Sequence, residues 1–298
     1  MSSHTSTSPT KDAGDPEWTI DNTKLFSFNP QGLEVDDEGQ DVDVEKVLLT
    51  DRQYRQHSIW RHILDGDLAK APVKDAEHVL DLGTGSGIWA MEFAKEHPNS
   101  KVVGIDLTKP TPHGIPSNCT FEQRDFMDPW TGPQNFDYIH GRLIFVAQSN
   151  PRQLLKNAYD ALSPGGYLEF HDLYGIPLAP DSSLSGRFAE QFFFEAACAL
   201  RNLGVGGLAL PKFADWMREL GFVDVVEEQR ALPLNSWPKG RYKQIGAMQV
   251  ENLRVGFPGI YTRMLIQGLG WSPEKTAEAI ERVVREVTDK SLHAYFPV

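Results

Sequence analysis

The segment His78–Ala90, with the sequence HVLDLGTGSGIWA, constrains the fold of this chain more than any other stretch. Its apolar run Val79–Leu82 predicts a buried parallel strand, and Ile88–Glu96 is expected to form a helix. Between the strand and the helix, three glycines stand at alternate positions: Gly83, Gly85 and Gly87. Glycines at this spacing allow a sharp turn and let a ligand approach the backbone without a Cβ in the way. A strand, a glycine turn and a helix in this order predict half of a nucleoside-binding sheet.

Acidic side chains follow the next two predicted strands. Lys101–Ile105 is expected to be the second strand, and it ends in Asp106, whose carboxylate is placed to accept hydrogen bonds from both hydroxyls of a ribose. Cys119–Gln123 predicts a third strand, which is followed closely by Asp125 and Phe126. An acid and an aromatic ring at this point can bind the amino group of an adenine and cover its face. We therefore expect an adenosine group to lie across these strand ends.

The glycine turn departs from the dinucleotide-binding fingerprint at one position. That fingerprint, G-x-G-x-x-G, requires its third glycine at position 88, where this chain has Ile88. Asp81 also lies close to the turn, where its carboxylate would repel a pyrophosphate but would attract a cation with a free amino group. S-adenosyl-L-methionine carries both a sulfonium and an ammonium group, so it is the ligand that we expect. The alternative is a structural turn that binds no ligand.

Four segments of the sequence carry a resemblance to a known family: DLGTGSGIWA, GIDL, FDYIHGR and LSPGGYLEF. They resemble the class I S-adenosylmethionine-dependent methyltransferases and, more narrowly, the fungal LaeA-like group, which is associated with secondary metabolism. The resemblance covers roughly residues 45 to 298 and includes the segment DRQYRQH, which ends at His57. It departs from the group in two places. The group's extended strand and loop before Asp51 do not align with residues 18–40, and its last strand normally runs on after the residue that matches Val298.

The resemblance implies a doubly wound, mostly parallel sheet of seven strands in a Rossmann-like α/β fold, with a helical cap inserted late in the chain. It also implies S-adenosyl-L-methionine as the cofactor and S-adenosyl-L-homocysteine as the product. His140 and Arg142, at the end of the fourth strand, would face the methionine half of the cofactor. The complete set of expected cofactor-binding residues lies at the carboxyl ends of the first four strands: Asp81, Gly83, Thr84, Gly85, Gly87, Asp106, Leu107, Asp125, Phe126, His140 and Arg142.

Composition excludes several other classes of function. Residues 1–45 contain eleven acidic and two basic side chains, a net charge of −9, which leaves −3 of the total of −12 for the rest. Without a basic stripe we expect no nucleic-acid partner. No apolar run approaches the length of a membrane span, and neither Cys119 nor Cys198 has a CxxC partner, so we expect a cytoplasmic protein, with the nucleus as the alternative. The nine histidines show no metal-ligand spacing, and we expect no metal site.

We expect one large domain preceded by a leader. Residues 1–40 predict a disordered acidic leader, and residues 41–298 predict the methyltransferase domain. Within that domain we expect an N-terminal helical segment, a cofactor-binding half and two helical regions on the substrate side, at 41–70, 78–171, 185–210 and 239–288 respectively. Phe222–Glu228 is expected to be the sixth strand. The helical segment that follows, interrupted at Gly256–Gly259 and Gly270, would cover the cofactor crevice before the final strand.

His171, immediately after the fifth predicted strand, is the candidate catalytic residue. It lies where ligands of open α/β sheets bind, so it is expected to act as a base or to orient an acceptor; its alternative role is that of a hydrogen-bonded histidine at the rim. We expect methyl transfer to oxygen, nitrogen or an acidic carbon of a small, fairly apolar metabolite. A regulatory protein, and an enzyme of cyclisation or rearrangement, are the alternatives. The expected partners are the small-molecule acceptor and, as alternatives, a second copy of the chain or a regulatory protein.

Overall fold

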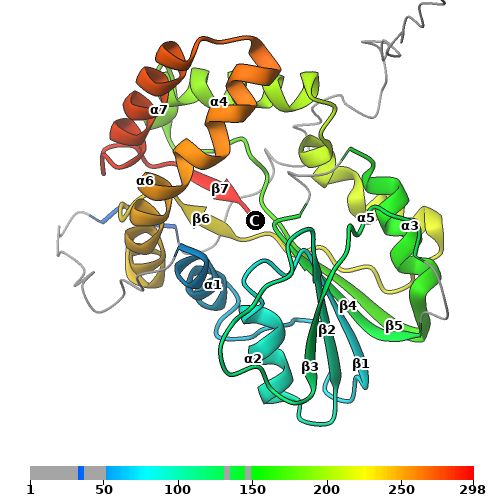
Figure 1. The fold of residues 1–298 in the computed structure, drawn as a ribbon. Helices are drawn as coiled ribbons and strands as arrows, with labels where there is room; N and C mark the ends of the chain where they lie inside the picture. The colour runs from blue at the N-terminus through cyan, green and yellow to red at the C-terminus, as the bar shows by residue number, and fades with distance from the viewer. Residues whose placement is uncertain (1–32, 37–51, 131–134, 145–148) are drawn as a thin grey trace, which may run out of the picture.

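The computed structural model describes residues 33–36, 52–130, 135–144 and 149–298 (Figure 1). Its strands are β1 His78–Leu82, β2 Lys101–Asp106, β3 Cys119–Gln123, β4 Phe136–Arg142, β5 Leu162–His171, β6 Ala231–Pro233 and β7 Tyr295–Pro297. Its α-helices are α1 Arg52–Ile63, α2 Ile88–Glu96, α3 Pro151–Ala161, α4 Phe188–Asn202, α5 Phe213–Leu220, α6 Gly240–Leu269 and α7 Pro273–Val287. Two 3-10 helices, η4 Ser182–Leu184 and η5 Gly206–Lys212, lie before and after α4.

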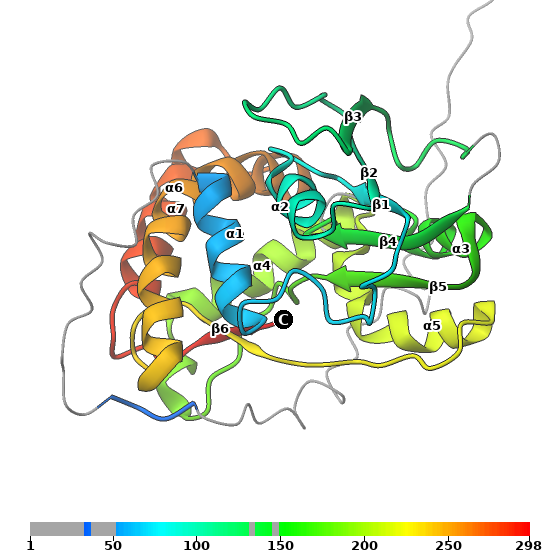
Figure 2. The same ribbon diagram turned by 90° about the horizontal axis from the view of Figure 1, so that it is seen from below.

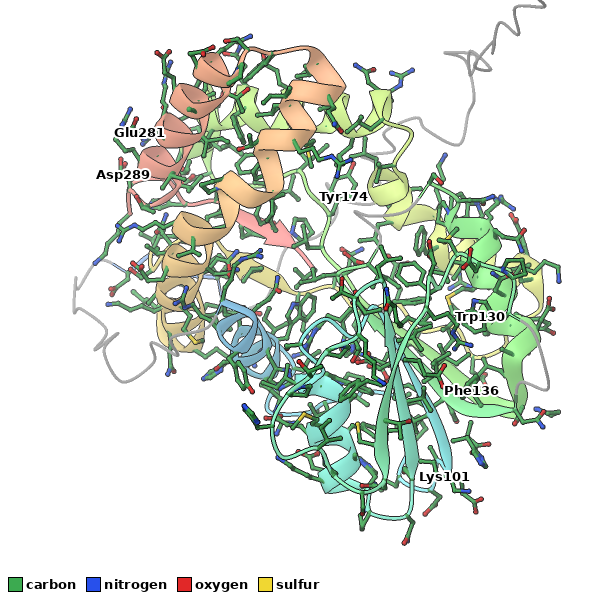
Figure 3. The ribbon with its side chains drawn as sticks, in the orientation of Figure 1. Lys101, Trp130, Phe136, Tyr174, Glu281 and Asp289 are labelled. Carbon is green, nitrogen blue, oxygen red and sulfur yellow. The ribbon has the colours of Figure 1, made fainter. Side chains whose placement is uncertain are left out.

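Five parallel strands form the central sheet in the order β3-β2-β1-β4-β5. Helix α2 packs on one face of the sheet, and α3 and α5 pack on the other. Strand β1 lies at the centre, and four of its five residues are buried because both of its faces are covered. The carboxyl ends of β4 and β5 point toward the remaining helices (Figure 2), and Lys101, which begins β2, lies at the opposite end of the sheet (Figure 3). The predicted doubly wound parallel sheet is confirmed, with five strands instead of seven.

The two other expected strands lie outside the central sheet. Phe222–Glu228 forms no strand, because Asp224 adopts a left-handed conformation with φ +52 and both Val223 and Val226 are exposed. An apolar, β-branched segment becomes a strand only where a neighbouring strand supplies hydrogen bonds and a buried face. Strand β7 does form, but it pairs antiparallel with β6 in a separate two-stranded sheet. The prediction of seven strands in one sheet was therefore wrong.

Helices α1, α4, α6 and α7 pack with β6 and β7 into a second body beyond the carboxyl ends of the central strands, which we call the helical lobe (Figures 1 and 2). Its core contains aromatic rings that meet edge to face: Phe193 of α4 lies 5.3 Å from Phe296 of β7 between ring centroids. Tyr174 lies between the sheet and the lobe (Figure 3), and its N–H donates to the carbonyl of Pro297 at 2.9 Å. The expected cap is thus a lobe with its own hydrophobic core.

Helix α6 is longer than the sequence suggested. We expected a break at Gly256–Gly259, but the helix runs without interruption from Gly240 to Leu269. The side chain of Arg52 fills the space beside Gly256, where a Cβ would lie 2.8 Å from Nε of Arg52. Packing of this kind can keep a segment helical even where it contains residues of low helix propensity. The break expected at Gly270 is confirmed, because this residue ends α6 at φ +67.

The N-terminal part of the chain supplies helix α1 of the lobe and a short segment that pairs beside β6. Helix α1 ends at Ile63, before the expected end of the helical segment at residue 70, because left-handed residues follow it at Asp65 and Gly66. The four described residues of the expected leader, 33–36, lie beside 237–239 and exchange backbone hydrogen bonds of 2.7 and 2.9 Å with them. The rest of the expected leader, and residues 41–51 of the expected helical segment, lie outside the described residues.

Candidate functional site

The glycine turn between β1 and α2 closes the carboxyl end of the central strand. Gly83, Gly85 and Gly87 have φ values of +62°, +57° and +80°, a left-handed conformation that residues with a Cβ rarely adopt. A Cβ at Gly83 would lie 2.8 Å from Ile144, and a Cβ at Gly87 would lie 2.4 Å from the ring of Phe121. Positions 83 and 87 therefore require glycine, and the turn lies close against Ile144, which follows β4, and Phe121 of β3.

Asp106, at the end of β2, lies beside this turn. Its Oδ2 accepts a hydrogen bond from the N–H of Gly85 at 2.9 Å, and its Oδ1 accepts one from the N–H of Thr108 at 3.2 Å. The carboxylate is half-buried, and the next side chain, Leu107, is 63% exposed. A carboxylate with further lone pairs beside an exposed apolar side chain suits a ribose with a base attached to it.

Asp125 and Phe126 reach the same edge from the end of β3. Oδ1 of Asp125 accepts a hydrogen bond from the N–H of Met127 at 2.8 Å, which fixes the start of the loop. The ring of Phe126 would lie 3.5 Å from a Cβ at Gly83, so the aromatic side chain borders the glycine turn. The structure thus brings together the turn, the second-strand acid and the third-strand acid and ring that the sequence predicted.

Asp81 and His140 lie beneath the turn, away from solvent. Oδ2 of Asp81 accepts a hydrogen bond from the hydroxyl of Thr84 at 2.6 Å, and its Oδ1 lies 2.7 Å from Nδ1 of His140. His140 is fully buried, and its ring stacks on Trp89 with 3.7 Å between centroids. Burial raises the pKa of the Asp81 carboxyl to about 7, although the hydrogen bond from Thr84 acts in the opposite direction. These two predicted residues thus border the site from below.

His171 ends β5 and is buried against the same group. Its Nδ1 lies 3.4 Å from Nε2 of His140, and its Nε2 lies 2.5 Å from Oε1 of Glu169. Burial alone would raise the pKa of Glu169, but the hydrogen bond and charge of His171, with two backbone N–H groups, lower it to about 2. Sequence reasoning missed Glu169, although alternate positions on one strand place it on the same face as His171.

Helix α1 brings further side chains to the end of β4. Arg142 donates from Nη2 to Nδ1 of His57 at 3.0 Å, and Nε2 of His57 donates to Oε2 of Glu92 at 2.9 Å. Burial lowers the pKa of Arg142 to about 10. Trp60 of α1 stacks on His171, with 5.7 Å between ring centroids. The segment DRQYRQH indicated that α1 belongs to the resemblance, but it gave no signal for these contacts.

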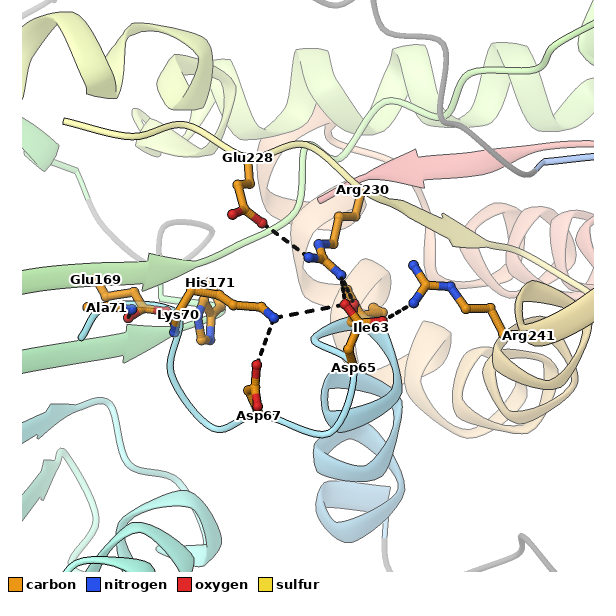
Figure 4. Close-up of polar contacts among 10 residues, drawn as sticks. All are labelled: Ile63, Asp65, Asp67, Lys70, Ala71, Glu169, His171, Glu228, Arg230 and Arg241. Atoms are coloured by element: carbon orange, nitrogen blue, oxygen red, sulfur yellow. Dashed lines mark hydrogen bonds and ion pairs between the residues drawn. The ribbon is translucent and has the colours of Figure 1, made fainter. Parts of the chain in front are cut away.

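Polar contacts hold the end of α1 against the rest of the molecule (Figure 4). Asp65 accepts a hydrogen bond from Arg230 at 2.6 Å and also pairs with Arg241 of α6. A few residues later, the N–H groups of Lys70 and Ala71 donate to the two carboxylate oxygens of Glu169 at 2.8 and 2.9 Å. The connection between α1 and β1 is therefore tied both to the lobe and to β5, by partners too distant in sequence to be predicted.

Other features of the described residues lie apart from this group. Asp172, which could be considered as a metal ligand, accepts a hydrogen bond from the N–H of Ile144 at 3.0 Å, and no three acidic, histidine or cysteine side chains of residues 33–36, 52–130, 135–144 and 149–298 gather to hold a metal. None of the helices in those ranges is both long and apolar enough to cross a membrane. A cavity of about 380 Å³ lies between residues 109–115 and β3, at the sheet edge opposite His171.

Comparisons with known proteins show the family to which the chain belongs. The family model described as "Methyltransferase domain" matches residues 52–227. "Methyltransferase pytC" of Aspergillus terreus is 29% identical over 83% of this chain and 77% of its own length, and "Methyltransferase cpsF" of Aspergillus campestris is 30% identical over 85% and 96%. "Secondary metabolism regulator LAE1" of Cochliobolus heterostrophus is 28% identical over 82% of this chain and 83% of its own length.

Proposed function

The chain belongs to the methyltransferase-domain family and is an S-adenosylmethionine-dependent methyltransferase, and from this premise we propose that it methylates a small, fairly apolar metabolite. The names of its relatives, which include fungal methyltransferases and a secondary-metabolism regulator, support a role in secondary metabolism. The proposed cofactor site is the carboxyl edge of β1 to β4. The proposed acceptor site is the region between that edge and the helical lobe.

One observation carries the placement of the cofactor. The three left-handed glycines, the Asp106 carboxylate bonded to Gly85, and the exposed side chain of Leu107 stand next to one another at the ends of β1 and β2. These residues fit S-adenosylmethionine. Position 83 has no room for a Cβ, which would meet Ile144, so the backbone of the turn stays open to a ligand. The Asp106 carboxylate can accept hydrogen bonds from the ribose hydroxyls, and an adenine would cover the exposed side chain of Leu107. Asp125 and Phe126 would bind the amino group and the face of the adenine.

The bound cofactor supplies a methyl group on a sulfonium, a carbon already activated for displacement by a nucleophile in line. The chain's own contribution is to hold the acceptor and to exclude water. Helix α1 of the helical lobe lies over the carboxyl ends of β4 and β5, where Arg142 contacts His57 and His171 contacts Trp60. An acceptor that is protonated at neutral pH needs a base, and His171 is the residue we propose for it. Both of its ring nitrogens already face partners, so it would act with them as a group.

A second candidate function is regulation through a protein partner. It is favoured by the match to a protein named as a secondary-metabolism regulator, over more than four fifths of both chains. The complete glycine turn and its acid argue for an active cofactor site in either case. The two candidates differ in the acceptor, which is a small molecule in the first and can be a protein in the second.

Calorimetric titration with S-adenosylmethionine tests the cofactor site. Asp106→Ala should weaken binding by about 100-fold, because it removes charge-assisted hydrogen bonds to the ribose. Glu77→Ala is a matched control: this exposed acid precedes β1 at the opposite edge of the same sheet, and the variant should bind like the wild type. Equal affinity of the Asp106→Ala variant and the wild type would refute the proposed site.

Incubation with methyl-labelled cofactor and extracts of a fungus that produces secondary metabolites tests the acceptor. The proposal predicts label in a small, organic-soluble product, detected by mass spectrometry, and its loss with the Asp106→Ala variant. Label that enters only protein would contradict the small-molecule proposal and would support the regulatory candidate.

A further inference from the structure

The backbone just beyond β4 is strained at Leu143. This residue has a φ of +56°, a left-handed conformation that costs free energy for any residue with a Cβ. Its N–H donates to the carbonyl of His171 at 2.9 Å. Strained residues persist only where their surroundings hold them, and they gather at functional sites. The contacts that hold Leu143 therefore indicate its role.

A buried side chain holds the residue that follows. The N–H of Ile144 donates to Oδ2 of Asp172 at 3.0 Å, and the N–H of Leu173 donates to Oδ1 of the same carboxylate at 2.9 Å. Asp172 is 6% exposed, so water competes little for these hydrogen bonds. Both oxygens of the carboxylate accept backbone N–H groups, which a side-chain amide with its single oxygen does not offer. This carboxylate and the carbonyl of His171 fix the strained backbone against the end of β5.

Two consecutive side chains at this point belong to the two halves of the molecule. Leu143 packs against the core of the helical lobe, whereas Ile144 is 4% exposed and lies in the core of the sheet half. Within that core Ile144 meets the glycine turn: a Cβ at Gly83 would lie 2.8 Å from its Cγ2. A Cβ at Gly141 would lie equally close to its Cδ1. Ile144 thus fills the space against which the turn packs.

The position of Ile144 bears on the cofactor site because two parts of that site meet beside it. The ring of Phe126 also borders this point, 3.5 Å from a Cβ at Gly83. Protein interiors are closely packed, so a side chain that moves leaves a void that its neighbours partly fill. A displaced Ile144 would therefore shift Gly83 and Phe126, which are both residues of the proposed cofactor site.

We propose that Asp172 is a positioning residue for cofactor binding: it holds Leu143 in the left-handed conformation and so keeps Ile144 against the glycine turn. Asp172 acts through the backbone N–H of Ile144 and needs no contact of its own with the cofactor. The effect on cofactor binding rests on the proposed function. The placement of Ile144 does not, and it can be measured without a ligand.

Three variants separate the carboxylate from the strain that it balances. Asp172→Asn turns one oxygen into an NH2 group that would face a backbone N–H, so Leu143 should leave the left-handed region. Adding Leu143→Gly should restore the wild-type backbone, because glycine adopts positive φ values without strain. Adding Leu143→Ala instead is the matched control, since alanine also removes the leucine side chain beyond Cβ but keeps the strain.

Methyl NMR of the ligand-free protein tests the placement of Ile144. Its Cδ1 methyl and the ring of Phe170 both lie within 3.0 Å of a Cβ placed on Gly141, so the ring current shifts the methyl signal. Asp172→Asn should move this signal toward that of an isoleucine remote from aromatic rings. The double variant with Leu143→Gly should return it to the wild-type position, and the one with Leu143→Ala should not. An unchanged Ile144 signal in Asp172→Asn would overturn the proposal.

Two single variants test the strain with the carboxylate intact. Leu143→Gly should unfold at a higher urea concentration than Leu143→Ala, because only glycine adopts the left-handed conformation freely. This order reverses the usual one, in which alanine is the more stabilising residue. The usual order would show that Leu143 is not held in a strained conformation and would overturn the proposal.

Calorimetric titration with S-adenosylmethionine tests the effect on the cofactor. Asp172→Asn should weaken binding about tenfold, and adding Leu143→Gly should bring it back to within about threefold of the wild type. Adding Leu143→Ala should leave binding as weak as in Asp172→Asn. Asp137→Asn is the control: Asp137 also accepts backbone N–H groups, those of Glu77 and His78, but at the opposite edge of the sheet, so this variant should bind like the wild type.

Comparison with Asp106→Ala separates this proposal from the proposed function. If Asp106→Ala weakens binding but Asp172→Asn binds like the wild type, the cofactor site stands and the positioning role is refuted. If Asp106→Ala binds like the wild type, the proposed cofactor site is refuted, and the Ile144 signal still decides whether Asp172 holds the strained backbone. Equal affinities of the two double variants would also overturn the role of the strain.

Discussion

The sheet half and the helical lobe hold their residues in place by different means. In the sheet half, the glycine turn, Asp106 and Asp125 follow three adjacent parallel strands, so strand order alone brings them to one edge. In the lobe, close backbone contacts between distant segments set the arrangement: a Cβ at Gly246 of α6 would lie 1.9 Å from the carbonyl oxygen of Asn235, and one at Gly268 would lie 2.7 Å from that of Ala199. The site is therefore defined locally, whereas the body that covers it depends on long-range packing.

A methyl group added at position 246 should destabilise the helical lobe without altering the glycine turn between β1 and α2. Gly246→Ala puts a Cβ into a rigid backbone, so we expect the free energy of unfolding to fall by about 3 kcal/mol or more, as in overpacked cores. The midpoint of urea unfolding measures it. The affinity of the folded fraction for S-adenosylmethionine should stay within about twofold, because no cofactor-binding residue is altered.

Gly259→Ala in the same helix is the control for this variant. Gly259 is exposed and nothing lies within 4 Å of a Cβ there, so the higher helix propensity of alanine should stabilise the protein by about 1 kcal/mol. Equal effects of the two substitutions would show that close packing at Gly246 does not hold the lobe.

The continuity of α6 can be tested at Pro258. In an unbroken helix this proline costs one hydrogen bond and adds a steric clash, so Pro258→Ala should raise the free energy of unfolding by about 2 kcal/mol after the gain in unfolded-state entropy is subtracted. Thermal unfolding followed by circular dichroism measures the change. If the helix were broken at Gly256–Gly259, as the sequence alone suggested, the same substitution would be neutral or destabilising.

The smallest expected effects come from two helix caps of the same design, one in each region. Asn150 caps α3 on the sheet by accepting from the N–H of Gln153, and Ser272 caps α7 in the lobe by accepting from the N–H of Lys275, each at 3.1 Å. Asn150→Ala and Ser272→Ala should each cost about 1 kcal/mol in urea unfolding. A much larger loss at one cap would show that the two regions differ in more than their long-range contacts.

These contrasts explain how much of the molecule the sequence could predict. The strand, turn and acid of β1 and β2 follow from residues less than thirty positions apart, and local spacing placed Gly83, Gly85 and Asp106 correctly in the fold. The sixth strand failed because Val223 and Val226 have strand propensity but no neighbouring strand.

The contacts that α1 makes at the site were harder to predict, because they join residues far apart in the sequence. His57 meets Arg142 and Trp60 meets His171 across separations of 85 and 111 positions, and no periodicity in the sequence encodes such pairs. Glu169 could have been found, since it stands two residues before His171 on the same strand. Its partners Lys70 and Ala71 could not, because they donate through the backbone.

A crystal structure of the protein with S-adenosylhomocysteine tests the central claim most directly. The account predicts the ribose hydroxyls within hydrogen-bonding distance of Asp106, the adenine over Leu107 and beside Asp125, and the methionine half along the glycine turn. A ligand bound elsewhere, or a carboxyl edge closed by α1 in crystals that contain the ligand at saturating concentration, would contradict it.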